Sequence, residues 1–268
     1  MLTNYLQRRP YPSMKWLQQL LADQRVPVHW WKPKPRPGTG FRGHFGDELS
    51  GVLYRWLTGE EAEWVAAEAR GKALGSGSIV GAAQPGDVVW GSGLNGDEEL
   101  GANWADVTFR SVRGPMTRER LVEAGAEVPA VYGDPALLVR RFVEAPKERR
   151  GTLVLPHPED MVRLMEEWAH APETMVWNAG ATVEGTIAAI NASARVVTSD
   201  LYGLIVAEAL GVPVVPMRMD AARSTFAFED YWRGTGREPL VFVDGLAAAL
   251  AAEAPAPAEL PDELFDRI

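Results

Sequence analysis

The segment Ser199–Val215 reads SDLYGLIVAEALGVPVV and follows the apolar run Val196–Thr198. The run predicts a buried strand, Leu201–Leu210 a helix and Val212–Val215 a second strand, with Gly211 ending the helix. A helix of about ten residues between two short apolar strands is typical of a βαβ unit. The segment therefore predicts a parallel sheet that is buried on both faces.

The same alternation of strands and helices extends over most of the chain. Expected strands are Val26–Trp31, Asp87–Trp90, Val107–Ser111, Ala130–Tyr132, Thr152–Leu155 and Met175–Trp177, and expected helices are Gly46–Leu57, Met116–Ala124, Glu159–Ala169 and Val183–Asn191. The polar stretch Glu144–Gly151 contains a proline, separates two such series and is the best candidate linker. We therefore predict an α/β protein of two lobes, residues 1–146 and 147–268.

Composition is that of an ordinary globular protein and argues against several functions. Of 268 residues, 46% are hydrophobic and 24% charged, and the net charge of −9 argues against a protein that coats nucleic acid. The chain has no cysteine and its four histidines lack metal-ligand spacing, so we expect no metal site. No apolar run reaches the roughly 20 residues of a membrane span, and the N-terminus lacks a signal-like apolar region. A cytoplasmic protein without a transmembrane segment is expected.

Four turns between predicted elements could carry chemistry, because ligands of parallel α/β folds bind at the carboxyl ends of strands. The first turn is Gly43–Glu48, where Asp47 is either an N-cap or a base toward a sugar hydroxyl. The second turn follows Val88–Trp90 and contains Gly93 and Asn95. Small residues at such a place let a ligand approach the backbone.

The third turn places arginines ahead of a predicted helix. Arg113 lies where the strand Val107–Ser111 ends, and Pro115 suits the first turn of the helix that follows. A guanidinium at that place can bind a carboxylate or a phosphate in a bidentate way, and Arg110 is a second candidate for the same anion. A surface or salt-bridged arginine is the alternative for Arg113.

The fourth turn is the beginning of Ser199–Val215. Ser199 and Asp200 follow a predicted strand, and Glu208 lies about two helical turns after Asp200, so that both carboxylates can share a helix face. His157 follows the strand Thr152–Leu155 and is expected at the same edge of the sheet. There His157 could act in catalysis or bind an anion.

Six motifs in order along the chain resemble the polysaccharide pyruvyl transferase family. They are Phe45–Leu49, Gly91–Gly93, Val112–Pro115, Tyr132–Ala136, Leu155–His157 and Ser199–Val215. The resemblance implies two Rossmann-like lobes arranged as in the GT-B glycosyltransferases, with the active site between them. It also implies transfer of pyruvate from phosphoenolpyruvate, the donor substrate, onto two hydroxyls of a sugar, with no cofactor. The acceptor would be a cell-surface polysaccharide or a lipid-linked oligosaccharide precursor.

The resemblance gives roles to the residues of the four turns. The arginines of the third turn would bind phosphoenolpyruvate, Asp47, His157 and Tyr202 would transfer protons, and the polar residues of the second and fourth turns would contact substrate. The family usually has histidine where this chain has Tyr202, and many members have arginine where it has Asp200. A tyrosine can donate a proton or a hydrogen bond but supplies no positive charge.

Two other functions remain open. Asp200 and Glu208, followed by ALGVPVV, also resemble the acidic pair of retaining GT-B glycosyltransferases that use nucleotide sugars. In those enzymes the first acid lies near the donor sugar and the second binds the ribose. A non-catalytic homologue that acts in polysaccharide assembly is the third interpretation. The sequence does not predict an oligomeric state.

Overall fold

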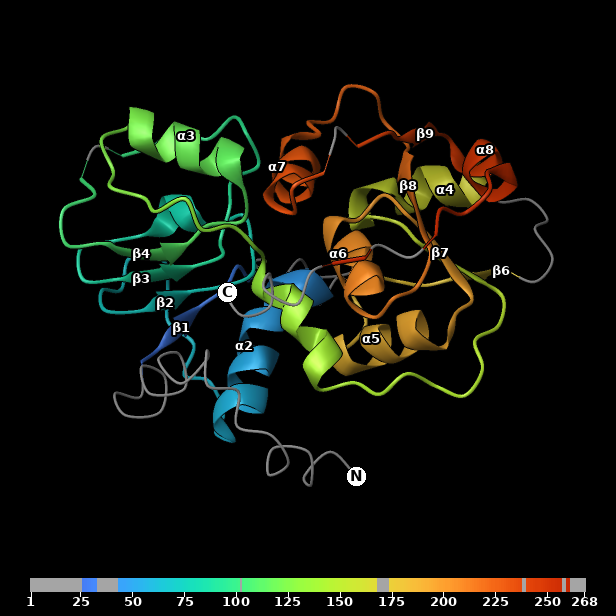
Figure 1. Ribbon diagram of the computed structural model, residues 1–268, viewed down its shortest axis with the longest axis horizontal. Coiled ribbons are helices and arrows are strands. Elements are labelled where there is room, and N and C mark those ends of the chain that lie inside the picture. Colours follow the sequence, from blue (N-terminus) through green and yellow to red (C-terminus); the bar gives the residue numbers. More distant parts are fainter. Residues whose placement is uncertain are drawn as a thin grey trace.

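Two parallel β-sheets form the framework in a computed structural model that describes residues 26–32, 43–101, 103–167, 174–237, 240–256 and 259–260 (Figure 1). The first sheet has the order β1-β2-β3-β4, from Val28–His29, Ala73–Leu74, Val88–Trp90 and Thr108–Ser111. The second has the order β6-β5-β7-β8-β9, in which β5 is Thr152–Leu155, β6 Thr174–Val176, β7 Arg195–Thr198, β8 Val214–Arg218 and β9 Val243–Asp244. All paired strands of both sheets run parallel, so the predicted α/β class is confirmed.

Helices pack around the two sheets. The α-helices are α2 (Phe45–Thr58), α3 (Pro115–Glu123), α4 (Met161–Glu167), α5 (Val183–Ala192), α6 (Leu201–Ala209), α7 (Phe226–Gly234) and α8 (Leu246–Ala251). Among the described residues the 3₁₀ turns are η2 (Val80–Ala82), η3 (Pro135–Arg141) and η4 (Pro158–Asp160). Both views show α2 beside α5, and Figure 1 shows α7 beside α3 of the first half.

Helix α6 lies at the centre of the packing. All nine of its residues are buried, as expected for a helix that is apolar on every face. It contacts β7 and β8 of its own sheet and also η3, α2 and α5. Gly211, with φ of 64°, ends it. The predicted helix Leu201–Leu210 is confirmed to within one residue.

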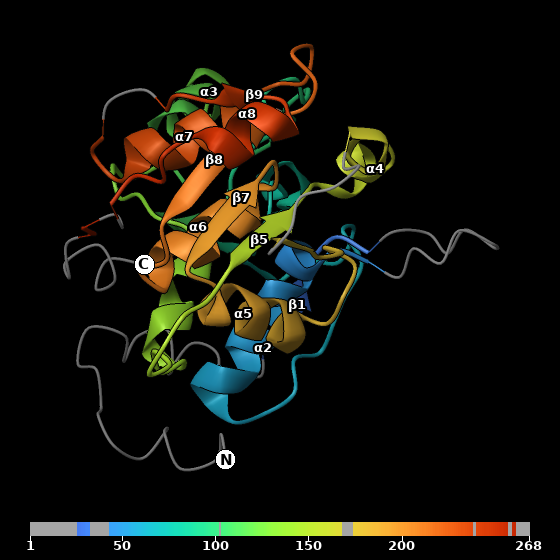
Figure 2. The same ribbon diagram turned by 90° about the vertical axis from the view of Figure 1, so that its right-hand side faces the viewer.

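The main hydrophobic core crosses the predicted lobe boundary. One cluster of buried side chains includes Leu49 of α2, Leu138 of η3 and Ile205 of α6. These side chains share a core because α2 and η3 pack on α6 (Figure 2). Segments from both sides of residue 146 are thus held together, while the division into lobes at 146 and 147 stays a prediction.

One predicted strand of the first half is not formed as expected. The expected strand Ala130–Tyr132 is reduced to one bridge between Val112 and Tyr132. The chain turns there because Gly133 has φ of 147° and the carboxylate of Asp134 caps η3.

The expected helix Glu159–Ala169 begins as η4 and continues as α4 to Glu167, and residues 168 and 169 lie outside the described residues. Strand β8 begins at Val214 and not at Val212, because the Val212 N–H still donates to the Ala207 carbonyl and closes α6.

Candidate functional site

The topology of the second sheet determines where its loops converge. From β5 the chain goes to β6 on one side and then returns to β7 on the other, so β5 and β7 flank the topological switch point where α/β folds bind ligands. His157 follows β5, and Ser199 and Asp200 follow β7. The His157 N–H donates to Ser199 Oγ over 3.1 Å. The structure thus brings these three predicted residues together.

Helix α2 adds His44 to this group. His44 is the N-cap of α2, and its Nδ1 accepts a hydrogen bond of 3.1 Å from the Gly46 N–H. Its Nε2 lies 2.6 Å from Oδ2 of Asp200. Asp200 caps α6 in turn, because its Oδ1 accepts from the Gly203 N–H at 2.8 Å. One carboxylate therefore caps α6 with one oxygen and binds an imidazole from α2 with the other.

The His44–Asp200 pair is buried, and each charge stabilises the other. Burial lowers the pKa of His44, but the charge of Asp200 and their hydrogen bond outweigh it and raise the pKa to about 9. Burial raises the pKa of Asp200, yet the attraction of His44 holds that pKa below its usual value. Protonation at Nδ1 gives up the hydrogen bond that this nitrogen accepts from the Gly46 N–H, and the negative charges of Asp200, Asp47 and Glu48 offset that loss. We therefore assign an imidazolium–carboxylate pair at neutral pH.

Two further titratable groups lie beside this pair. Oδ2 of Asp47 is 3.9 Å from Nδ1 of His44, and burial raises the pKa of Asp47 to about 6 despite the opposing charge of His44. The ring centroid of His157 is 5.9 Å from that of His44, and burial lowers the pKa of His157. Near neutral pH the site therefore contains a charged imidazole, a neutral imidazole and a carboxyl group that can change its charge. Asp47 is not the N-cap of α2, because His44 has that place.

Tyr202 is enclosed by its neighbours. Its ring packs on Gly46, where any Cβ would overlap it, and the ring centroid is 6.4 Å from that of His44. Its hydroxyl donates to Oδ2 of Asp134 at 3.3 Å. Burial and the carboxylate of Asp134 raise the pKa of Tyr202 well above its usual value, so the phenol stays protonated. Proton donation by Tyr202 stays a prediction, and its proton points at Asp134.

Asp134 connects loops from the two halves of the chain. Its Oδ1 accepts from Ser76 Oγ at 3.0 Å and from the Ala136 N–H at 2.9 Å, while its Oδ2 accepts from Tyr202. Burial raises the pKa of Asp134 to about 6. The loop after β2, the beginning of η3 and the beginning of α6 therefore meet at one buried carboxyl group.

Arg113 has a structural role in place of its predicted contact with an anion. Its side chain is fully buried, and the guanidinium donates to Ser78 Oγ at 2.8 Å and to the Leu94 carbonyl. Its Nε lies 3.3 Å from Oδ2 of Asp230. Gly93 leaves room for this guanidinium, because a Cβ there would overlap it. Arg113 is therefore the salt-bridged arginine that the sequence left open as an alternative. The group that approaches Gly93 closely is the guanidinium of Arg113 and not a ligand.

The second turn and Arg110 lie apart from the cluster around His44. Arg110 is exposed on β4. Asn95 is exposed in the loop after β3, and its carbonyl accepts from Ser224 Oγ at 3.0 Å. A substrate contact at either residue stays a prediction.

Glu208 stabilises the contact between α6 and α7. Its two oxygens lie 2.7 and 2.8 Å from the guanidinium nitrogens of Arg237, and the Tyr231 hydroxyl donates to Oε2 at 2.6 Å. Asp200 binds His44 at the opposite end of α6. The two acids therefore have separate partners, and the predicted pairing of Asp200 and Glu208 on one binding face is not formed.

The residue that sequence reasoning missed is His44. It lies in the turn Gly43–Glu48, but the strong N-cap preference for aspartate drew attention to Asp47. Its ion-pair partner is 156 residues away, so no local spacing indicates the pair. The only available signal was its position just before a helix in a glycine-flanked turn.

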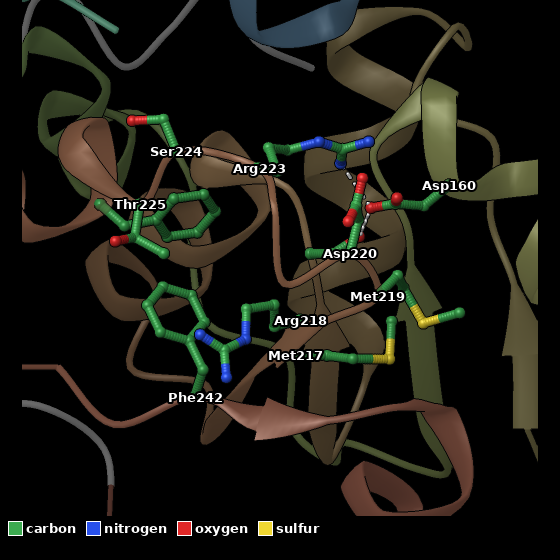
Figure 3. A pocket seen from close by; sticks show the side chains of 11 residues that line it. Asp160, Met217, Arg218, Met219, Asp220, Arg223, Ser224, Thr225 and Phe242 are labelled. Carbon is green, nitrogen blue, oxygen red and sulfur yellow. Dashed lines mark hydrogen bonds and ion pairs between the residues drawn. The ribbon is translucent and has the colours of Figure 1, made fainter. Parts of the chain in front are cut away.

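A small pocket opens at the carboxyl end of β8 (Figure 3). Asp160 of η4 lies at its edge and accepts through Oδ2 from Ser199 Oγ at 2.6 Å and from Arg223 Nη1 at 2.7 Å. Ser199 lines the pocket and also accepts from the His157 N–H. The pocket and the cluster around His44 are therefore neighbours.

The described ranges contain no group of three or more histidine, aspartate or glutamate side chains placed to hold a metal ion. Within the same ranges, no helix combines the length and the apolar character that crossing a bilayer requires.

Comparison with known proteins gives little further information. No family model matches the chain, and no curated protein matches it. The chain is similar in fold to the crystal structure of an uncharacterized protein from Klebsiella pneumoniae subsp. pneumoniae NTUH-K2044, with 13% sequence identity and a TM-score of 0.47. That likeness covers 88% of this chain and 100% of the other. A likeness with so low an identity and TM-score indicates no function.

Proposed function

We propose that the chain is an acid–base transferase that moves pyruvate from phosphoenolpyruvate onto two hydroxyls of a sugar, in a cell-surface polysaccharide or its precursor. The observation that carries this proposal is the ion pair between His44 and Asp200. It places an imidazolium beside Tyr202, the position at which the pyruvyl transferases have histidine. A histidine from α2 would thus replace the one that α6 lacks. The proposal includes a GT-B-like arrangement of the two sheets around this point.

The proton transfers of the reaction match the groups at the site. His44 would give the Nδ1 proton to the methylene carbon of phosphoenolpyruvate and stay bound to Asp200 through Nε2. A sugar hydroxyl then bonds to the central carbon and releases its proton to Asp47, whose pKa of about 6 leaves it largely ionised at neutral pH. Phosphate leaves with the electron pair of its carbon–oxygen bond and takes the proton from Asp47, which restores that carboxylate. The second hydroxyl closes the ketal and returns a proton to His44.

The N-termini of two helices would attract the substrate. Phosphoenolpyruvate is an anion, and the positive charge of His44 is already balanced by its ion pair with Asp200. Helices α2 and α6 both begin at the site, and the partial positive charge of a helix N-terminus favours anions. The attraction would come from these helices, because Arg113 is buried and paired with Asp230.

One observation argues against a glycosyltransferase that uses nucleotide sugars. It requires Glu208 to bind a ribose, and both oxygens of Glu208 are bound by Arg237, with Tyr231 donating as well. Strongly shifted pKa values cluster at catalytic sites, and those of His44 and Asp47 favour an enzyme over a non-catalytic partner. We therefore keep pyruvyl transfer as the proposal.

The test is phosphate release from phosphoenolpyruvate in the presence of a panel of methyl pyranosides. We expect His44→Gln to slow release about 10²- to 10⁴-fold, the usual contribution of a positioned proton donor. His29→Gln is the matched control, because His29 is also buried but bonds to the Val65 carbonyl in the first sheet. Equal rates for His44→Gln and wild type, or stabilisation by nucleotide sugars alone, would overturn the proposal.

A further inference from the structure

His157 is attached to a backbone that is fixed on both sides. It lies between Pro156 and Pro158, and a residue that precedes proline is confined to extended backbone. Its φ of −57° and ψ of 144° lie in that region. Its N–H donates to Ser199 Oγ at 3.1 Å, which ties the loop after β5 to the loop after β7. The backbone therefore presents the His157 ring in one defined place.

One ring nitrogen of His157 is used within its own loop. Its Nδ1 accepts a hydrogen bond of 3.3 Å from the Glu159 N–H and thereby caps η4. A neutral imidazole has one N–H, so a nitrogen that accepts leaves the proton on the other. The proton of the neutral His157 ring is therefore on Nε2. Within the part of the chain that the structure describes, this Nε2 has no hydrogen-bond partner.

The surroundings of His157 keep its ring neutral. Burial lowers its pKa, and so do the positive charges of His44 on α2 and Arg223 in the loop after β8. The carboxylates of Asp200 after β7 and Glu159 of η4 act in the opposite direction, but the pKa stays below its usual value. A second imidazolium would also compete with His44 for Asp200, whereas a neutral ring leaves that ion pair intact.

His157 is the most exposed side chain of the cluster around His44. Its side chain is 35% exposed. The side chains of Asp47, His44 and Asp200 are 21%, 9% and 2% exposed. The ring centroids of His157 and His44 lie 5.9 Å apart. A group that binds to His157 from solvent therefore lies beside the buried ion pair.

A fixed N–H donor of this kind favours an oxyanion as its ligand. Hydrogen bonds to an ionised acceptor are roughly twice as strong as those to a neutral one. Phosphate and carboxylate groups are oxyanions that a substrate can present at neutral pH. A neutral imidazole can serve as their donor at a catalytic site, because it polarises a substrate oxygen without carrying a charge itself.

We propose that His157 binds an oxyanion of the substrate as a neutral hydrogen-bond donor, through Nε2–H, and transfers no proton itself. In phosphoenolpyruvate the oxyanion is the phosphate or the carboxylate group, and this assignment rests on the proposed function. The two histidines then have separate roles. His157 holds the substrate beside the ring of His44, and His44 supplies the proton.

The first measurement is nitrogen-15 NMR of the histidine rings in the full chain near neutral pH. We expect His157 to have a protonated Nε2 and a bare Nδ1. His29 is the control in the same spectrum, because its Nδ1 lies 2.8 Å from the Val65 carbonyl and carries the proton. The two residues should therefore show opposite tautomers.

The same sample tests the ligand. Inorganic phosphate and pyruvate are added separately, and sodium chloride at equal ionic strength is the control. We expect at least one of the two anions to shift the Nε2 signal of His157 and neither to shift the signals of the buried His29. A response to phosphate assigns the phosphate group of the substrate to His157, and a response to pyruvate assigns the carboxylate.

A pair of variants separates a hydrogen-bond donor from an acid–base group. His157→Gln and His157→Phe both lose the Nδ1 acceptor, and neither can transfer a proton. Glutamine keeps an N–H donor near the position of Nε2, and phenylalanine does not. We expect His157→Phe to weaken binding of the responding anion about ten- to hundredfold, and His157→Gln to weaken it by about threefold or less.

Three results would overturn the proposal: the His157 proton lies on Nδ1 or on both nitrogens, neither anion shifts Nε2, or glutamine weakens binding as much as phenylalanine does. The failure of the proposed function looks different. A chain that binds an anion through His157 but releases no phosphate from phosphoenolpyruvate keeps the donor and loses the transferase. A chain that releases phosphate with an unchanged KM for phosphoenolpyruvate in His157→Phe keeps the transferase and loses the donor.

Discussion

Two of the buried ion pairs among the described residues have contrasting designs. In the first half, Lys72 and Asp87 are fully buried, and the Lys72 ammonium also donates to the carbonyls of Ala69 and Ala82. The Asp87 carboxylate accepts from the backbone N–H groups of Lys72 and Gln84. The two residues lie 15 positions apart in the sequence. The ammonium group donates all three of its protons, one to the Asp87 carboxylate and two to these carbonyls.

The second pair joins residues 156 positions apart and has titratable neighbours. His44 has one ring nitrogen on Asp200 and the other near Asp47, whose pKa is about 6. The contrast teaches how a structural pair differs from a candidate catalytic one. A pair whose protons are all bound to fixed partners stabilises the fold, whereas a pair with a second titratable group beside it can pass a proton on.

The largest expected effect comes from opening the structural pair. Lys72→Met leaves the carboxylate of Asp87 buried without its cation, and we expect a loss of about 3–5 kcal/mol in the free energy of unfolding. Arg55→Met is the control, because Arg55 pairs with Glu184 and Glu61 at the surface, where less than about 1 kcal/mol is expected. Urea unfolding measures both. Similar losses in the two variants would remove the distinction between a buried and an exposed pair.

The second pair gives the protein a pH-dependent stability. The pKa of His44 is about 9 in the folded state and 6.5 in the unfolded state, so its contribution is fully present below pH 6.5 and is lost as the pH rises through about 9. The difference amounts to about 3 kcal/mol. Asp47 affects stability at lower pH. Its pKa is raised from 3.8 to about 6 in the folded state, so the folded state loses stability as the pH rises through this range.

The measurement is urea unfolding of wild type and His44→Gln between about pH 6.5 and 9.5. Wild type should lose stability across this range and His44→Gln should not. His29 has a lowered pKa, so its effect falls below pH 6.5 with the opposite sign, and His29→Gln should follow wild type above that value. Parallel curves for all three proteins would contradict the assignment of charge to His44.

A smaller effect is expected for Tyr202→Phe, which tests whether Tyr202 or His44 donates the proton. Tyr202→Phe removes one hydroxyl from the buried carboxyl group of Asp134, which keeps its bonds to Ser76 and Ala136, and should cost about 1 kcal/mol in stability. If His44 is the proton donor, phosphate release should stay within about threefold of wild type. A loss as large as that of His44→Gln would transfer the donor role to Tyr202.

The sequence predicts local elements well and distant partners poorly. Thr152–Leu155 and Leu201–Leu210 could be located because apolar periodicity and glycine stops are local signals. Asp47, His157 and Asp200 meet at one place because they follow strands of parallel sheets or begin a helix, which a fold rule predicts. The sequence left open whether Arg113 binds an anion or forms a salt bridge, because nothing local indicates that Ser78, Leu94 and Asp230 enclose it. The link between His44 and Asp200 depends on how α2 packs on α6, which only the tertiary structure determines.

The most direct test of the account is the pKa of the His44 ring, followed by nitrogen-15 NMR as the pH is raised in wild type and in Asp200→Asn. Asparagine can still cap α6 at Gly203, so the variant removes the charge and keeps the helix beginning. We predict a pKa of about 9 in wild type and a clear fall in Asp200→Asn, where burial lowers the pKa and only the smaller raising effects of Asp47 and Glu48 remain. A His44 ring that titrates at or below 6.5 in wild type would contradict the claim that the site holds a proton ready for transfer.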